Sequence, residues 1–327
     1  MTLNDIGFYT LCDARAVNAS LTSRLWRGEI VLGANCNFHC PYCRHVGGKD
    51  IETQKACELI EAWGRQGLFA IRFSGGEPPL HPGLIEFVTV ARKHGIERIA
   101  ISTNGSAAQD LYEELLRAGV NDCSVSLDAC CAEDGDLMAG GMKGAFDIIT
   151  ANIRWLAQRT YTTVGVVLTE QNMATLNDII IFADSLGVAD IRIIPAAQQG
   201  ARLANVQVSE ALLSKYPILR YRIRNIQTGQ PVRGLRPGMD SRRCGLVLDD
   251  VAVNQDKHYP CIIYLRERGK AIGTVGPQMR GEREQWYRTT DTHADPICRR
   301  NCIDACVDYN NLFEAAHPRL ETVHEGR

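Results

Sequence analysis

The sequence lacks any long hydrophobic run and any excess of charge of one sign. No apolar stretch approaches the ~20 residues that a helix needs to cross a bilayer, and 36 Lys and Arg against 38 Asp and Glu leave a net charge of −2. This balance argues against a nucleic-acid partner and against binding to a membrane surface. Asp5 and Asp13 lie where a secretory signal would be basic. We therefore expect a cytoplasmic protein with no membrane partner.

The sequence also lacks an even number of cysteines. Its 13 cysteines cannot all pair in disulfides, and 327 residues with 45% hydrophobic content can form a core without covalent cross-links. In a reducing compartment, such cysteines usually bind metal or take part in chemistry. The cysteine content is therefore the first functional indication.

Short β-rich runs alternate with segments of helical periodicity up to about Gly200. The expected strands are residues 29–32, 70–73, 98–102, 124–127, 164–168 and 191–194. This alternation predicts an α/β fold with a parallel sheet covered by helices. Six such units are too few for a closed eight-stranded barrel, and they suit an open, partial barrel or a doubly wound sheet. In either fold the loops after the strands form the chemical face.

The alternation stops after Gly200, so we expect more than one domain. The predicted parts are an N-terminal segment at 1–25, a partial barrel at 26–205, a junction rich in Arg, Pro and Gly at 206–240, and a small C-terminal domain at 241–327. The last part holds five cysteines and few long apolar runs. Metal binding would therefore supply part of its order.

Seven arginines lie within the 24 residues from Arg220 to Arg243. The alternation of Arg220, Arg222 and Arg224 fits the solvent-facing side of a strand, and a run of charge is usually solvated. Arginine also recognises phosphate and carboxylate through its planar fork. If some of these side chains point inward, the small-molecule substrate carries anionic groups.

Three cysteines follow the first expected strand, in the segment Cys36-Asn-Phe-His-Cys40-Pro-Tyr-Cys43. On so short a loop all three can face one point. An iron–sulfur cubane needs four ligands, so three cysteines leave one iron open to a substrate or cofactor. The alternative is a zinc knuckle that borrows His39 or His45.

This triplet, with an aromatic residue directly before its last cysteine, resembles the C-x3-C-x2-C signature of the radical S-adenosylmethionine (radical SAM) superfamily. The resemblance implies a partial (β/α)6 TIM-like barrel in which Cys36, Cys40 and Cys43 hold a [4Fe–4S] cluster with SAM on its open iron. With an electron from an external donor such as flavodoxin or ferredoxin, SAM would be cleaved to a 5′-deoxyadenosyl radical that abstracts a hydrogen atom from the substrate.

Polar residues at the next strand ends resemble the SAM contacts of the same superfamily. Glycines let the backbone approach a ligand, and a Glu can accept a hydrogen bond from the SAM ammonium. In place of an arginine expected in residues 139–146 there is a lysine, which either pairs with the SAM carboxylate or is solvated. The expected SAM contacts are Gly75, Gly76, Glu77, Ser102, Asn104, Ser126, Asp128 and Lys143.

The C-terminal cysteines are Cys244, Cys261, Cys298, Cys302 and Cys306. Their segment resembles the SPASM/twitch extension of radical SAM enzymes, which binds auxiliary iron–sulfur clusters. Five thiols supply one four-cysteine cluster, so we expect one auxiliary [4Fe–4S] cluster on Cys244, Cys261 and two of the other three. Four of these thiolates could equally form a zinc site.

These features together predict a radical SAM enzyme that oxidises a small polar substrate of sugar, aminocyclitol or nucleotide type, with the auxiliary cluster as electron acceptor. The preference for a small substrate rests on the short segment before the barrel. One alternative is epimerisation, with Cys130, Cys131 or the unligated C-terminal thiol as hydrogen-atom donor. Further alternatives are modification of a ribosomal peptide or protein side chain and a non-catalytic zinc-binding module.

Overall fold

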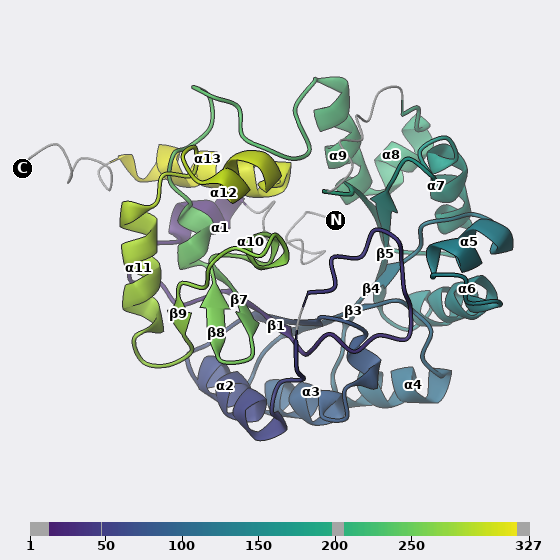
Figure 1. The fold of residues 1–327 in the computed structure, drawn as a ribbon, viewed down its shortest axis with the longest axis horizontal. Coiled ribbons are helices and arrows are strands. Elements are labelled where there is room, and N and C mark those ends of the chain that lie inside the picture. Colours follow the sequence, from purple (N-terminus) through teal and green to yellow (C-terminus); the bar gives the residue numbers. More distant parts are fainter. Residues whose placement is uncertain (1–12, 47, 198–205, 319–327) are drawn as a thin grey trace, which may run out of the picture.

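The computed structural model describes residues 13–46, 48–197 and 206–318 (Figure 1). Residues 1–12 of the expected N-terminal segment lie outside the described part. The strands are β1 (Arg27–Val31), β2 (Ala70–Ser74), β3 (Arg98–Thr103), β4 (Asp122–Ser126), β5 (Tyr161–Leu168), β6 (Asp190–Pro195), β7 (Asp250–Asn254), β8 (Lys257–Tyr259) and β9 (Gly273–Thr274). All six expected strands are present as β1–β6.

One curved sheet contains all nine of these strands, in the order β6-β5-β4-β3-β2-β1-β7-β8-β9. The neighbours from β6 to β7 are parallel, and the β7–β8 and β8–β9 pairs are antiparallel. Because β6 and β9 are the two edges, the sheet does not close on itself. The prediction of a partial barrel is confirmed.

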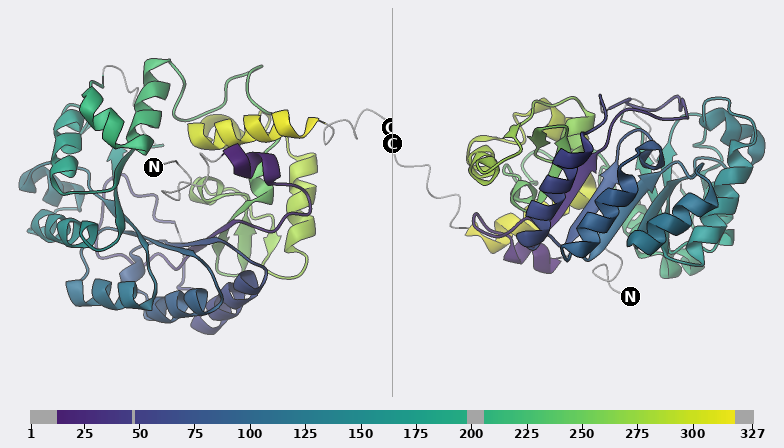
Figure 2. Two further views of the ribbon diagram at one scale, coloured as in Figure 1. Left: turned by 180° about the vertical axis from the view of Figure 1, so that it is seen from behind. Right: turned by 90° about the horizontal axis from the view of Figure 1, so that it is seen from below.

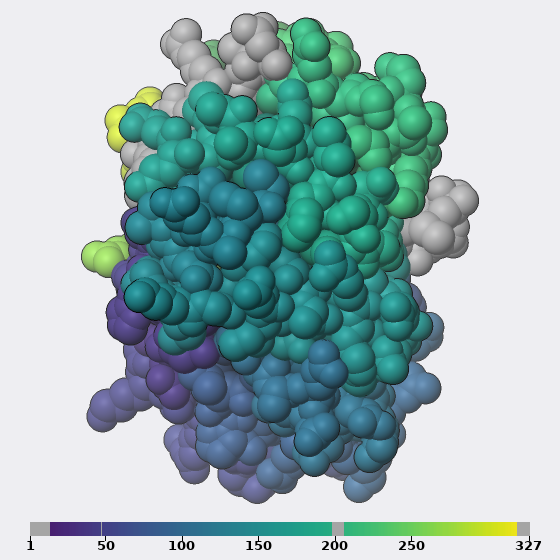
Figure 3. Space-filling model, turned by 90° about the vertical axis from the view of Figure 1, so that its right-hand side faces the viewer, coloured from purple at the N-terminus to yellow at the C-terminus, as the bar shows by residue number. Residues whose placement is uncertain are grey.

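Helices cover the outer face of the sheet (Figures 1 and 2). The helices of the first half are α1 (Asp13–Asn18), α2 (Thr53–Arg65), η2 (Pro78–Leu80), α3 (Leu84–Lys93), α4 (Gln109–Ala118), α5 (Ala132–Met138), α6 (Ala145–Ala157) and α7 (Leu176–Ser185). Those of the second half are α8 (Glu210–Lys215), α9 (Pro217–Gln227), η3 (Gly245–Leu248), α10 (Ile262–Arg266), α11 (Met279–Thr289), α12 (Pro296–Asn301) and α13 (Asp304–Ala316). Figure 3 shows one side of the molecule, on which the teal and green residues of the middle of the chain lie above the blue residues that precede them.

The main core lies between the barrel strands and their helices. Helix α2 shows why the layers pack closely, because Ala56, Ile60 and Trp63 recur at helical spacing and are buried. A Cβ on Gly28 of β1 would lie 2.5 Å from the Trp63 ring, so that close approach needs glycine. None of the described helices is long and apolar enough to cross a bilayer.

The C-terminal part continues the barrel sheet. Strand β7 pairs with β1 in parallel, with Arg27 opposite Asp250, and a hairpin then adds β8 and β9. Helix α1, the first helix of the described residues, packs on α13 and so lies against this part. A second buried cluster forms there around Leu246, Tyr309 and Phe313.

The arginine-rich junction forms a helix, and the strand considered for Arg220, Arg222 and Arg224 is wrong. Residues 217–227 form α9, which starts at Pro217 and buries apolar residues at helical spacing against β6. In a helix, Arg220 and Arg224 lie on one side. Arg222 is buried instead, at 2.7 Å from Asp304 of α13. The segment is helical and not a strand because the apolar residues between the arginines recur at helical spacing and face the barrel.

Candidate active site

The carboxyl ends of the barrel strands surround a cavity of about 460 Å³, a size typical of small-molecule sites. Most of the residues expected from the sequence line it. They are Cys36, Cys40, Cys43, Gly75, Gly76, Glu77, Ser102, Asn104, Ser126 and Asp128. The structure therefore brings the cysteine triplet together with the motifs that end β2, β3 and β4.

The cysteine loop follows β1 directly and presents three thiols that form no disulfide. Cys36 and Cys40 are half-buried and Cys43 is exposed. The backbone N–H groups of Phe38 and His45 donate to the sulfurs of Cys36 and Cys43, each at 3.4 Å. Burial raises the pKa of the Cys40 thiol to about 11. A cationic centre would therefore be needed to hold it as a thiolate.

The two glycines after β2 serve a packing role that the sequence does not reveal. A Cβ on Gly75 would lie 2.6 Å from the Gly33 carbonyl oxygen, and one on Gly76 would lie 2.0 Å from that of Asn35. The Gly76 N–H donates to the Gly33 carbonyl and the Glu77 N–H to the Asn35 carbonyl, both at 2.8 Å. These glycines therefore fix the β2 loop against the base of the cysteine loop.

Glu77 joins three loops of the site. It is 3% exposed, and its carboxylate accepts hydrogen bonds from the Thr103 hydroxyl and from the Asn104 N–H. The Asn104 amide donates to the Asn37 side chain at 2.9 Å, within the cysteine loop. Burial raises the pKa of Glu77 to about 7, and the hydrogen bonds from Thr103 and Asn104 offset only part of this shift. A ligand ammonium beside it would favour the charged form.

Asp128, which follows β4, anchors the cysteine loop from a second position on the cavity wall. The hydroxyl of Tyr42, which lies between Cys40 and Cys43 in sequence, donates to one Asp128 oxygen, and the Val167 N–H donates to the other at 2.6 Å. Burial raises the pKa of Asp128 to about 6. Both oxygens thus have protein partners, and the carboxylate links β4, β5 and the cysteine loop.

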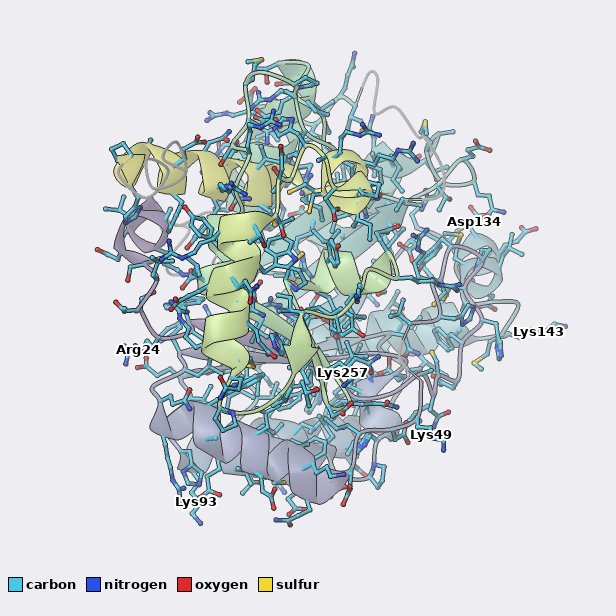
Figure 4. All side chains as sticks on the ribbon, turned by 60° about the vertical axis from the view of Figure 1, so that its left-hand side comes forward. Arg24, Lys49, Lys93, Asp134, Lys143 and Lys257 are labelled. Carbon is cyan, nitrogen blue, oxygen red and sulfur yellow. The ribbon has the colours of Figure 1, made fainter. Side chains whose placement is uncertain are left out.

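Among the residues expected at the SAM and substrate end of the barrel, Lys143, Cys130 and Cys131 lie outside the cavity lining. Lys143 is exposed, and Figure 4 shows it at the periphery of the molecule. The Cys131 thiol is exposed and donates to Asp134 at 3.3 Å, while Cys130 packs partly against the main core.

Charged side chains line the interior of the barrel, a feature that was not predicted from the sequence. Arg27 and Glu29 of β1, Arg72 of β2 and Arg192 of β6 all line the cavity. Arg72 donates to the Ser102 hydroxyl at 3.0 Å. The signal was present, because each of these residues interrupts an apolar strand at an inward position of the period-two pattern.

The five C-terminal cysteines line a second, smaller cavity, which confirms that tertiary folding brings them together. Cys261 and Cys306 line both cavities. Burial, and then the charge of Cys244, raises the pKa of the Cys261 thiol to about 12. Five thiols without a disulfide in one buried pocket fit the donor set of an iron–sulfur cluster, with one thiol in excess.

Residues 30–183 match the family model described as the Radical SAM superfamily. An AdoMet-dependent heme synthase of Oleidesulfovibrio alaskensis is 30% identical over 193 residues, which cover 55% of this chain and 49% of the relative. The mycofactocin maturase MftC of Mycobacterium tuberculosis is 30% identical over 165 residues, covering 48% and 41%. The PqqA peptide cyclase of Gluconobacter oxydans is 28% identical over 210 residues, covering 62% and 58%. The matches thus span about half the length of these relatives.

Two groups of solved structures share the fold. SuiB of Streptococcus suis superposes with a TM-score of 0.59 at 12% identity, over 84% of this chain and 67% of SuiB. The anSMEcpe protein with bound AdoMet gives 0.58 at 14% identity, over 91% and 98%. A [4Fe–4S] cluster and SAM are the cofactors of the matched family, in agreement with the sequence prediction. With the matched residues, the partial barrel and the cysteine triplet after β1 in agreement, the chain contains a radical SAM domain over residues 30–183.

Proposed function

We propose that Cys36, Cys40 and Cys43 hold the [4Fe–4S] cluster with one open iron and that the substrate occupies the adjoining barrel cavity. The observation that carries this proposal is the single cavity that contains both the triplet and the polar ends of β2–β4. When bound, the reduced cluster and SAM supply a 5′-deoxyadenosyl radical for hydrogen-atom abstraction. The barrel walls orient the substrate and exclude water from the radical.

Glu77 is the acceptor we propose for the SAM ammonium. Its carboxylate is buried, lines the cavity and already accepts two hydrogen bonds, and each oxygen keeps a further lone pair. The backbone of Gly75 and Gly76 and the side chains of Ser102, Asn104 and Ser126 supply the other polar contacts. Asp128 acts by positioning Tyr42 on the cysteine loop.

The C-terminal pocket is the proposed site of one auxiliary [4Fe–4S] cluster. Cys244, Cys261 and two of Cys298, Cys302 and Cys306 would ligate it. Because Cys261 and Cys306 line both cavities, a cluster there borders the substrate cavity and could accept an electron from the substrate radical. Oxidation of a small polar substrate is therefore the favoured reaction.

Epimerisation is the second candidate reaction. The cavity lining reduces the number of thiols that could donate the hydrogen atom. Cys130 and Cys131 lie outside the cavity lining, so the unligated C-terminal thiol is the better hydrogen-atom donor. A peptide is the second candidate for the substrate, because the matched relatives include a PqqA peptide cyclase and the SuiB structures include one bound to precursor peptide SuiA.

Iron analysis of the Cys36/Cys40/Cys43→Ala triple variant tests the two-cluster proposal. After anaerobic reconstitution we expect about four irons per chain, because one cubane remains on the C-terminal thiols. The wild type should contain about eight and should form 5′-deoxyadenosine from SAM when dithionite is added. Iron near zero in the variant, or stoichiometric zinc, contradicts the auxiliary cluster. Solvent deuterium fixed in the product carbon after turnover in D2O would favour epimerisation over oxidation.

A further inference from the structure

The barrel cavity is lined by several arginines, and not all of them form an ion pair with a carboxylate. Seven arginines line it: Arg27, Arg44, Arg72, Arg192, Arg222, Arg233 and Arg266. Five of them lie within 4 Å of a carboxylate. These pairs are Arg27 with Glu29 and Asp250, Arg44 with Glu267, Arg72 with Asp122, Arg222 with Asp304, and Arg266 with Glu29. Among the described residues, Arg192 and Arg233 have no such partner.

Arg192 lies in the middle of β6 and faces the cavity. Its Nε atom is buried without a hydrogen-bond partner. Burial and the charge of Arg72 lower the pKa of its guanidinium to about 10, although the charges of Asp122 and Glu29 act in the opposite direction. A buried charge of this kind is kept where a ligand of opposite charge compensates it.

Arg233 lies on the same wall. Its Nε donates to the carbonyl of Pro195, the last residue of β6, at 2.9 Å, and its Nη1 donates to the Asn301 carbonyl at 3.5 Å. These contacts hold the guanidinium beside β6 without neutralising it. Burial lowers its pKa; the charge of Glu267 opposes this shift, and the charges of Arg222 and Arg266 add to it. Two guanidinium groups that have no carboxylate within 4 Å among the described residues therefore lie along β6, Arg192 at its middle and Arg233 at its carboxyl end.

We propose that this wall, formed by Arg192 and Arg233, binds an anionic group of the substrate, a carboxylate or a phosphate. The inference rests on the proposed function, since it places the substrate in the same cavity. The expected SAM contacts end β2, β3 and β4, whereas β6 is the edge strand at the far end of that series. The proposed anion site therefore lies apart from the loops that carry the expected SAM contacts. The planar forks of the two arginines suit paired oxygen acceptors.

The test uses anaerobically reconstituted, SAM-saturated protein with inorganic phosphate and malonate as probes, each titrated by calorimetry. At least one probe should bind at one site per chain. Arg192→Gln should weaken that binding by about tenfold or more, the effect of losing a charged hydrogen bond. The control Arg224→Gln removes the same charge from an exposed position on α9 and should bind within about twofold of wild type. Phosphate-only or malonate-only binding identifies the class of anion.

Thermal unfolding separates a binding role from a structural one. Arg192→Gln should melt at or above the wild-type temperature, because it removes a partly buried charge that has no carboxylate within 4 Å among the described residues. The bound probe should raise the melting temperature of wild type and of Arg224→Gln, and not that of Arg192→Gln. A lower melting temperature for Arg192→Gln, equal probe affinity in both variants, or no probe binding to wild type overturns the inference. If wild type forms no 5′-deoxyadenosine, the proposed function fails instead, and the probe titration still decides whether the anion site exists.

Discussion

The two cysteine sets of this protein are assembled in opposite ways. Cys36, Cys40 and Cys43 lie on one loop, which the β2 and β3 loops and Asp128 hold in place from outside. The five C-terminal cysteines come from different elements. Cys244 directly precedes η3 and Cys261 directly precedes α10. Cys298 lies in α12, Cys302 caps the carboxyl end of that helix, and Cys306 lies in α13.

This difference in assembly predicts different consequences when the two cysteine sets are changed. A loop that presents its own ligands can lose one of them without disturbing the barrel core. The C-terminal pocket forms only when η3, α10, α12 and α13 pack together, so its ligand geometry depends on the fold of that whole part. Damage to the first set should therefore appear in activity, and damage around the second set in stability and metal content together.

Cys40→Ala should give the largest effect. We expect 5′-deoxyadenosine formation to fall to background, because two local thiolates do not hold a cubane with one open iron, while the melting temperature of the apo protein stays near wild type. The control is Cys57→Ala, whose thiol lies in α2 and lines neither cavity. Chromatography of anaerobic reactions measures the product. Activity retained by Cys40→Ala would remove the triplet from the mechanism.

Glu77→Gln should weaken SAM binding by about 1–3 kcal/mol, the usual range for a lost hydrogen bond to a charged group. The glutamine side chain has only one acceptor oxygen, so it cannot accept hydrogen bonds from both Thr103 and Asn104. It also carries no negative charge to pair with the SAM ammonium. Calorimetric titration of the reconstituted protein with SAM measures the change. Glu114→Gln, at an exposed position of α4, is the matched control. Equal SAM affinity in the two variants would show that Glu77 is structural only.

Gly245→Ala tests the claim that the C-terminal site depends on packing. A Cβ there would lie 2.3 Å from the ring of Phe313, which is buried in the C-terminal core. We expect the free energy of unfolding to fall by at least about 1 kcal/mol through overpacking, with less auxiliary iron retained.

The matched control for this change is Gly281→Ala in α11, where an added Cβ meets nothing within 4 Å. A glycine-to-alanine change in an open helix interior should stabilise the protein by about 0.5–1 kcal/mol. Urea unfolding measures both variants. A Gly245→Ala protein as stable as Gly281→Ala would break the link between packing and the second cysteine set.

What the sequence predicts well is local. The six barrel strands alternate with helices at short range, and the triplet lies directly after the first strand, so their spacing alone places them on one face. The polar ends of β2, β3 and β4 follow from the same rule, because parallel strands present their carboxyl ends at one edge.

What the sequence did not predict depends on distant partners. Strand β7 pairs with β1 across more than two hundred residues, as Arg27 opposite Asp250 shows, and no local pattern specifies that register. The need for glycine at position 76 comes from the Asn35 carbonyl, which only the folded loops bring near. The inward turn of Arg222 depends on Asp304 of α13.

Lys143→Ala should have the smallest effect. It tests whether Lys143 binds SAM, as the sequence resemblance implies, or is a solvent-exposed residue, as in the structure. The resemblance assigns Lys143 to the SAM carboxylate, but its side chain is exposed and lies outside the cavity lining. Figure 4 shows it at the periphery of the molecule. An exposed lysine without a partner contributes within about 0.5 kcal/mol to stability or binding. SAM affinity of Lys143→Ala should therefore match wild type in the titration used for Glu77→Gln. A loss comparable to that of Glu77→Gln would mean that the loop at 139–144 closes over the cavity when SAM binds, which would restore the assignment made from the sequence.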